Sequence, residues 1–225
     1  MKASMLFKLA IVTGVFIILA HRVPAQLKQN PTADLLVQLI RVNTSNPPGN
    51  NRELAELLAK KFRELGVEVE IVPTPDAEKV HFIARVKGDG SKRPVLLAAH
   101  ADVVGVEREK WTVDPFAGDV KDGYIYGRGA IDYKGGIAVF AEAIMELVKN
   151  HVALHRDVIL LSEADEESGP YGTSWLAKSH WNLMDCEFAL NEGGWIIKGA
   201  NGGVQYVSIS TGDKVAIPLI VKAQG

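Results

Sequence analysis

The sequence of 225 residues predicts an α/β fold in which a mainly parallel mixed sheet is flanked by helices. Three observations favour this fold. Short apolar runs of strand length alternate with longer segments whose apolar residues recur at helical spacing, which is typical of strand–helix–strand units. Some of these runs are continuously apolar, as expected for strands that are buried on both faces. The composition, with 47% hydrophobic and 23% charged residues, is that of an ordinary globular protein.

Two helices and three strands are expected before residue 100. Asn30-Pro31 has the sequence of a helix start and predicts a helix through about Val42. A second helix, ended by Gly66, is predicted from the residues that share its apolar face, Leu54, Leu57, Leu58, Phe62 and Leu65. Three strands should follow, at Val67–Val72, His81–Val86 and Pro94–Ala99. Because only the turn Gly88-Asp89-Gly90 separates the last two strands, we expect them to pair as a hairpin.

The second half of the sequence predicts further alternation of helices and strands. A long loop from Asp102 to Lys134 should contain one short strand, Tyr124–Tyr126. A mostly apolar helix of the buried kind is predicted at Gly135–Asn150. The remaining predicted elements are a buried strand at Val158–Ser162, a short helix at Gly172–Ser179, and strands at Phe188–Leu190, Val204–Ser210 and Val215–Val221.

Residues 1–25 have the pattern of a secretory signal peptide. Lys2 and Lys8 supply the positive start, a short apolar run extends from Leu9 to Ala20, and small residues precede Gln26. The apolar run is shorter than the ~20 residues that a membrane-spanning helix needs, so export with cleavage is favoured over a membrane anchor. The protein is therefore predicted to be periplasmic or extracellular.

Charge and cysteine content narrow the classes of partner. The formal net charge is −2, and loss of residues 1–25 would remove three basic residues and no acidic one, leaving −5. The sequence has no basic stripe, so nucleic acid is not an expected partner. Cys186 is the only cysteine, which excludes an internal disulfide, and it is expected to be a small buried apolar side chain.

Polar residues gather directly after the predicted strands, where ligands bind in open α/β sheets. The residues that follow strand ends are His100, Asp102, Glu163, Asp165, Glu166, Glu167, Asn191 and Glu192. A further acid, Asp132, lies in the Gly-rich turn before the helix Gly135–Asn150. Four or five ionised carboxylates in one pocket repel each other strongly unless cations are bound there. The sequence therefore predicts a metal site at this edge of the sheet.

The types of residue indicate which metal is expected. One imidazole among several carboxylates suits zinc or a similar first-row ion, whereas calcium prefers oxygen ligands only. The number of acids fits two ions with one bridging carboxylate better than one ion. Asp102 is placed to accept a ring N–H of His100 and so to fix its tautomer. Each short pattern has an ordinary explanation by itself, since His-x-Asp is common and acidic turns are usually solvated, so the prediction rests on their combination.

The order of these residues resembles the co-catalytic zinc metallopeptidases, the family of aminoacylase, acetylornithine deacetylase, succinyl-diaminopimelate desuccinylase and glutamate carboxypeptidase. The resemblance extends from about residue 30 to the end of the sequence. The matching segments are Asn43–Gly49, Ala99–Val104, Trp111–Phe116, Asp122–Gly136, Asp165–Gly169 and Asn191–Gly194. The block Tyr124–Gly136 is the most specific, and it favours this family over the two-zinc aminopeptidases that have a similar ligand order.

The resemblance implies two zinc ions, with Co²⁺ or Mn²⁺ as alternatives. Asp132 would bridge the two ions, His100 and Glu192 would hold one of them, and Glu167 would hold the other. The substrate would be a small peptide or an N-acyl amino acid, and the enzyme would be of the carboxypeptidase, dipeptidase or aminoacylase type.

Two further residues would serve the reaction. Asp102 would orient His100, and Glu166 would be the general base that takes a proton from water and returns it to the leaving amine. A non-catalytic metal-binding protein with a degenerate site is the alternative. It is disfavoured because Glu166 has no purpose in a structural zinc site, which would be closed.

One departure from the family concerns the second zinc ion. The family completes that ion with a His near its C-terminus, after an inserted lid domain, and the 225 residues contain neither. We therefore expect residues 26–213 to be the N-terminal part of a catalytic domain and residues 214–225 to begin a truncated lid. Such a fragment is expected to be inactive alone, and any homodimer contact is expected in the missing lid.

Overall fold

The computed structural model describes residues 30–210 and 222–223. The predicted signal peptide at residues 1–25 and the predicted strand Val215–Val221 lie outside the described residues, as does almost all of the predicted lid segment 214–225. These three expectations stay predictions. Among the helices that are described, none is long and apolar enough to cross a membrane.

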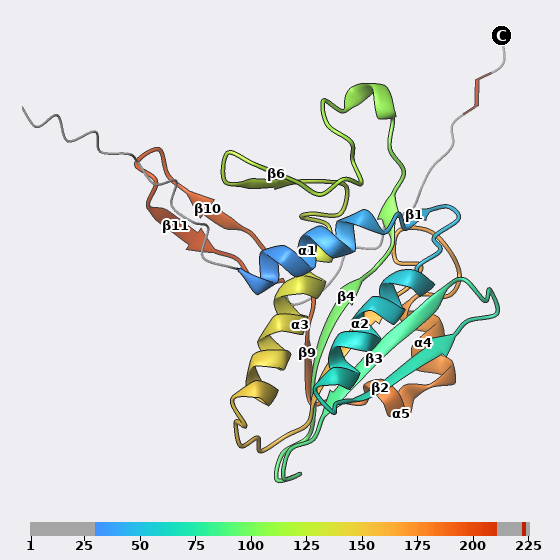
Figure 1. Ribbon diagram of the computed structural model, residues 1–225, viewed down its shortest axis with the longest axis vertical. Helices are drawn as coiled ribbons and strands as arrows, with labels where there is room; N and C mark the ends of the chain where they lie inside the picture. The colour runs from blue at the N-terminus through green and yellow to red at the C-terminus, as the bar shows by residue number, and fades with distance from the viewer. Residues whose placement is uncertain (1–29, 211–221, 224–225) are drawn as a thin grey trace, which may run out of the picture. The chain divides into compact units, whose positions relative to one another are not determined.

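The described part of the chain forms a mixed α/β structure (Figure 1). The α-helices are α1 (Pro31–Arg41), α2 (Arg52–Glu64), α3 (Lys134–Lys149), α4 (Thr173–Ser179) and α5 (Trp181–Met184), and η1 (Arg108–Lys110) is a 3₁₀ turn. The strands of the main sheet are β2 (Glu68–Pro73), β3 (Val80–Val86), β4 (Val95–His100), β8 (Val158–Glu163) and β9 (Phe188–Leu190). The other strands are β1 (Ser45–Asn46), β5 (Val103–Val104), β6 (Asp119–Lys121), β7 (Tyr124–Tyr126), β10 (Ile196–Lys198) and β11 (Val204–Val207).

The main sheet has five strands in the order β2-β3-β8-β4-β9. Strands β8, β4 and β9 run parallel, whereas β2 and β3, and β3 and β8, pair antiparallel. The predicted mixed sheet flanked by helices is thus confirmed. The parallel part places the polar residues that follow its strands together, because parallel neighbours bring their carboxyl ends to the same edge.

The predicted hairpin between the second and third strands is wrong. Strand β8 lies between β3 and β4 and uses both of its edges to pair with them. The turn after β3 is fastened to the segment before β8 instead, since the Asp89 N–H donates to the Leu154 carbonyl at 2.8 Å and the Gly88 N–H to Asp157 Oδ1 at 2.9 Å. A short turn therefore does not imply that its flanking strands pair.

Two apolar clusters form the core, one on each face of the sheet. Successive side chains of a strand point to opposite faces, and in β3 Phe82 joins one cluster while Ile83 joins the other. Helices α1, α2 and α3 supply the first cluster, which includes the fully buried Phe62. Helices α4 and α5 supply Leu176 and Met184 to the second. Each large side chain that is fully buried in this way contributes about 1.5–3 kcal/mol of hydrophobic free energy.

Most predicted elements occur within a few residues of their expected bounds, but several short ones were not predicted. Helix α5 and strands β1, β5, β6 and β10 are only two to four residues long, too short for a periodic pattern. Cys186 is half-buried and not fully buried as expected, because it lies just before the edge strand β9 and only borders the second cluster. Strand β11 ends at Val207, earlier than the predicted Ser210.

Lys134, the first residue of α3, is fully buried and ties the loop before it to α1. Its ammonium group donates to the carbonyl oxygens of Leu39 and Val42, at 3.1 and 2.6 Å. These carbonyls lie at the C-terminal end of α1, where main-chain oxygens lack partners within the helix. Burial lowers the pKa of Lys134 to about 7. The contact fixes the loop that carries Asp132.

Candidate metal centre

The carboxyl ends of β4, β8 and β9 bring the predicted site residues together. His100 and Glu163 end their strands and stand opposite each other in the parallel register of β4 and β8. Glu192 follows two residues after the end of β9, which pairs with the other edge of β4. The prediction that these strand ends converge is confirmed by this arrangement.

His100 lies at the centre of the site and is 1% exposed. Its Nδ1 is 2.8 Å from the main-chain oxygen of Asp102, so Nδ1 carries a proton and donates it there. Its Nε2 points at carboxylates, with Asp132 Oδ1 at 2.9 Å and Glu192 Oε2 at 3.6 Å. Burial lowers the pKa of His100, but the hydrogen bond to Asp102 and the charges of Glu192, Asp102 and Glu166 outweigh it and raise that pKa above its usual value.

The contact between Asp102 and His100 differs in detail from the expected one. The carboxylate of Asp102 is 3.8 Å from Nδ1, and the main-chain oxygen of Asp102 takes the ring proton instead. The carboxylate, which is fully buried, accepts the main-chain N–H groups of Glu166 at 3.2 Å and Glu167 at 3.1 Å. It also accepts the Asn46 side-chain amide at 2.8 Å. Asp102 thus holds the ring by its main chain and the Glu166–Glu167 turn by its side chain.

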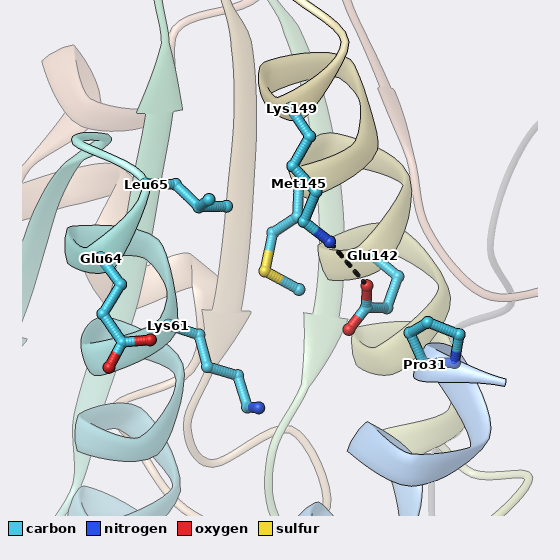
Figure 2. A pocket seen from close by; sticks show the side chains of 7 residues that line it. All are labelled: Pro31, Lys61, Glu64, Leu65, Glu142, Met145 and Lys149. Atoms are coloured by element: carbon cyan, nitrogen blue, oxygen red, sulfur yellow. Dashed lines mark ion pairs between the residues drawn. The ribbon is translucent and has the colours of Figure 1, made fainter. Parts of the chain in front are cut away.

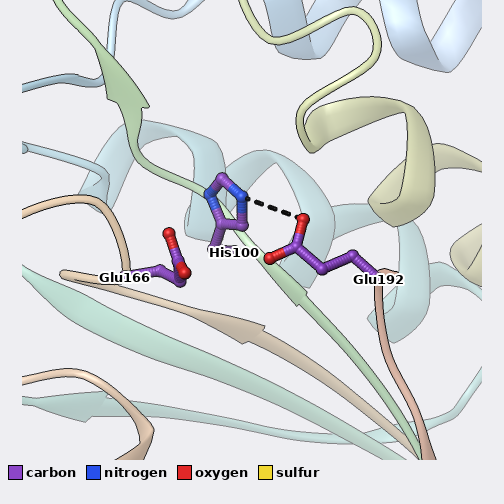
Figure 3. A group of neighbouring side chains, drawn as sticks. All are labelled: His100, Glu166 and Glu192. Carbon is purple, nitrogen blue, oxygen red and sulfur yellow. Dashed lines mark ion pairs between the residues drawn. The ribbon is translucent and has the colours of Figure 1, made fainter. Parts of the chain in front are cut away.

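Two groups of side chains have the geometry to hold a metal ion. His100, Glu166 and Glu192 form one group, and His100, Asp132 and Glu167 form the other; within each, one ligand atom per residue lies within 4.8 Å of the others. Figure 3 shows Glu166 and Glu192 on either side of the His100 ring. The structure therefore brings together all four predicted ligands and the predicted base. Glu166 belongs to the same group as His100 and Glu192, so the division of roles between Glu166 and Glu192 stays a prediction.

The electrostatics of the cluster suit a bound cation. Among residues 30–210, Asp132 and Glu192 form ion pairs only with His100. Glu166 and Glu167 form no ion pair with any of these residues. Burial and then the neighbouring negative charges raise the pKa values of Glu166, Glu167 and Glu192, while His100 lowers them. Carboxylates that crowd without cations are unfavourable, and zinc or a similar ion relieves this while accepting both imidazole and carboxylate ligands. The donor set fits the predicted metal.

A cavity of about 550 Å³ adjoins this cluster, and the turn after β9 forms one of its walls. Asp132, Tyr133, Glu192 and Trp195 are among its lining residues, so it gives access to the acids from outside. A smaller pocket of about 200 Å³ lies between α1, α2 and α3 (Figure 2). It is lined by opposite charges, including Lys149 at 4.0 Å from Glu142, and contains no histidine. Of these two, only the larger cavity is lined by residues of the candidate metal cluster.

Two polar residues that support the site, Asn46 and Lys79, were not predicted from the sequence. Asn46 and Lys79 both donate to Asp165 Oδ1, at 3.0 and 2.7 Å, and all three residues are buried. Asn46 belongs to the Asn43–Gly49 segment that was noted, but nothing local marked its side chain as a contact of residue 165. Lys79 precedes β3 and resembles any solvated lysine in the sequence.

Comparison with known proteins gives a consistent result. The family described as "Peptidase family M20/M25/M40" matches residues 96–211. The chain is 37% identical over 140 residues to a succinyl-diaminopimelate desuccinylase of Hahella chejuensis, and 34% identical over 137 residues to an acetylornithine deacetylase of Klebsiella pneumoniae. Each match covers 61% of this chain and 35% of the relative.

Solved structures show the same likeness. An M20 family metallo-carboxypeptidase from Sulfolobus solfataricus superposes with a TM-score of 0.64 at 25% identity, covering 73% of this chain and 37% of that one. The chain thus spans about a third of the length of the relatives it matches.

Proposed function

Because the chain belongs to peptidase family M20/M25/M40, we propose that it is the metal-holding part of a two-zinc hydrolase of peptide or N-acyl amino acid bonds. The observation that carries the proposal is His100 with its Nε2 facing several carboxylates that have no other cation among the described residues. The desuccinylase and deacetylase among the relatives favour an N-acyl amino acid substrate, and the carboxypeptidase favours a peptide.

In this proposal His100 and Glu192 would hold one zinc ion, Glu167 would hold the other, and Asp132 would be shared between them. Zinc bound there would polarise the scissile carbonyl and stabilise the charge that develops on its oxygen. Co²⁺ and Mn²⁺ have similar ligand preferences and are alternatives. The second ion would have only Glu167 and the shared Asp132, below the three protein ligands that are usual for a catalytic zinc.

Glu166 is the proposed general base. A carboxylate oxygen of Glu166 takes a proton from the attacking water and returns it to the nitrogen of the leaving amine. Burial, together with the charges of Glu192, Asp102 and Asp132, raises its pKa. A raised pKa suits this task, because the carboxylate must both gain and lose the proton near neutral pH. Asp102 serves by fixing the turn that carries Glu166.

Export is also part of the proposal, through residues 1–25, and any homodimer would form through the lid domain. The candidate zinc ligands within residues 30–210 are too few for two complete sites, so we expect the chain alone to bind metal but not to turn over substrate. Turnover would require at least one further ligand to the second ion.

The proposal is tested by metal content and hydrolysis. Zinc bound per chain is measured after dialysis for the wild type, for His100→Gln and for the control His180→Gln, which changes an imidazole outside the cluster. The wild type and the control should retain zinc, and His100→Gln should lose it. Hydrolysis of N-acetyl and N-succinyl amino acids and of dipeptides is then compared between this chain and a longer product of the same reading frame. Equal zinc content in all three proteins would contradict the site, and turnover by the chain alone would contradict its predicted inactivity.

A further inference from the structure

We propose that the buried ion pair of Lys79 and Asp165, joined to Asp102 by Asn46, is a positioning device for the turn that carries Glu166 and Glu167. This inference rests on the proposed function, since it concerns the residues that would hold the metal and serve as its base. The side chains of Lys79, Asp165 and Asn46 need not contact metal or substrate. Their effect passes through the main chain of the turn.

Asp165 is held from three sides. Its side chain is 0% exposed, and its carboxylate accepts Lys79 Nζ at 2.7 Å, Asn46 Nδ2 at 3.0 Å and the Tyr171 N–H at 3.2 Å. Its main chain has a φ of +58°, in the left-handed region that residues other than glycine seldom adopt. Such a conformation persists only where surrounding contacts hold it. After this conformation at Asp165, the N–H groups of Glu166 and Glu167 both donate to the Asp102 carboxylate.

Asn46 connects this ion pair to Asp102. Its amide nitrogen donates to Asp102 Oδ2 at 2.8 Å and to Asp165 Oδ1 at 3.0 Å, and also contacts the Ser168 carbonyl. Asp102 in turn accepts the N–H groups of Glu166 and Glu167. The turn is therefore fastened before Glu166, at both of its glutamates, and after Glu167. The two glutamates extend from a main chain that is fixed at each end.

Stability alone does not explain an ion pair at this place. Burying two charges costs roughly as much as their attraction returns, so apolar residues of similar size would serve the fold equally well. A second ion pair offers the comparison. Arg85 and Asp157 join β3 to β8 at the opposite end of the same two strands, at 3.1 Å, with both side chains 17% exposed. That pair contacts no residue of the acidic turn, so it provides a matched control.

The test compares two double variants of the chain. Lys79→Met with Asp165→Asn removes the first ion pair without leaving a lone buried charge, and Asn tolerates the left-handed conformation at residue 165. Arg85→Met with Asp157→Asn removes the second pair in the same way. Amide hydrogen exchange of residues 164–172 is measured in the metal-free proteins. We expect exchange about tenfold faster in the first variant, because the turn opens locally more often without its ion pair, and unchanged in the second. Equal protection in both variants would overturn the inference.

Titration with Co²⁺ gives a second measurement. The visible absorption of bound Co²⁺ should report an affinity about tenfold or more weaker in the first variant than in the wild type, and unchanged in the second. The single variant Lys79→Arg, which keeps the charge, should retain both the affinity and the protection. A wild type that binds no Co²⁺ would refute the proposed function, whereas the exchange measurement would still decide whether Lys79 and Asp165 position the turn. Equal affinities in a wild type and first variant that both bind Co²⁺ would overturn the inference while leaving the proposed function intact.

Discussion

His81 should make the protein less stable as the pH falls from about 6.5 to about 4. The ring is fully buried in β3 and stacks on Trp175, with ring centroids 5.8 Å apart. Its Nε2 lies 2.8 Å from the Tyr171 carbonyl, and its Nδ1 accepts the Ala164 N–H at 3.4 Å. Both contacts are satisfied by a neutral ring with its proton on Nε2. A second proton would bind at Nδ1, where the resulting N–H would face the Ala164 N–H and the hydrogen bond between them would be lost.

The size of the effect follows from the pKa of His81. Burial lowers that pKa from 6.5 to about 4. Between these values the unfolded chain binds a proton that the folded protein does not, so stability is complete above about pH 6.5 and is lost as the pH falls towards 4. A difference of one in pKa corresponds to about 1.4 kcal/mol, which gives roughly 3 kcal/mol in all and about 2 kcal/mol between pH 7 and pH 5.

The wild type alone does not reveal this loss, because Glu163 acts in the opposite direction. Burial raises the pKa of Glu163 from 4.5 to about 7. The folded protein therefore gains that proton before the unfolded chain does, and stability rises as the pH falls from about 7 to about 4.5. The two contributions are similar in size and nearly cancel.

The assay is therefore a difference between the wild type and a variant that cannot titrate at residue 81. Urea unfolding, followed by far-UV circular dichroism in metal-free buffer, gives the free energy of unfolding at pH 7 and pH 5. For His81→Gln, which keeps a donor for Tyr171, the stability deficit should shrink by about 2 kcal/mol from pH 7 to pH 5. His81→Asn, with a different deficit at pH 7, should show the same change. A deficit that is equal at both pH values would refute the argument.

Three further predictions concern the loop, the base and the metal. Gly123 and Gly129 have φ of +83° and +84°, but a Cβ at Gly129 would lie 2.7 Å from Val103 Cγ1, while one at Gly123 meets nothing within 4 Å. In urea unfolding, Gly123→Ala should lower the free energy of unfolding by about 1 kcal/mol, and Gly129→Ala should lower it by about 1–3 kcal/mol more. Equal losses in the two variants would contradict this prediction. The variant Glu192→Gln should lose bound Co²⁺, whereas Glu166→Gln should keep it. In the longer protein, Glu166→Gln should lower the rate of hydrolysis about 10²–10⁴-fold. Loss of metal in both variants would show that Glu166 is a ligand and not the base. Zinc at 100 times its Kd should raise the free energy of unfolding by about 2.7 kcal/mol, measured by thermal unfolding, and His100→Gln should show no such gain.

The sequence predicted which polar side chains gather at this edge of the sheet because their placement depends on a local rule. His100, Glu166 and Glu192 follow apolar strands directly, and parallel strands bring their carboxyl ends to one edge wherever they stand in the sheet. The same locality explains the correct helices, since the apolar face of α2 is visible within its own residues. Neither inference needed the order of the strands.

What the sequence could not predict depends on contacts between distant segments. The bond from Asn46 to Asp165 joins residues 119 apart, and that from Lys79 to Asp165 joins residues 86 apart. The failed hairpin has the same cause, because β8 enters between β3 and β4 from far along the chain. A turn sequence reports only on its own residues, whereas strand pairing is decided by the whole sheet.

The acids at this edge of the sheet are neutralised in different ways, and the difference supports the proposed metal ligands. Asp165 is paired with Lys79, Asp102 accepts three N–H groups, and Glu163 has its pKa raised to about 7 by burial. The remaining acids are Asp132, Glu166, Glu167 and Glu192, which share His100 as their one cationic neighbour within residues 30–210. One imidazolium cannot balance four carboxylates, so these four are the ones that need a bound cation. They are the three carboxylates that we propose as metal ligands and the residue that we propose as the base.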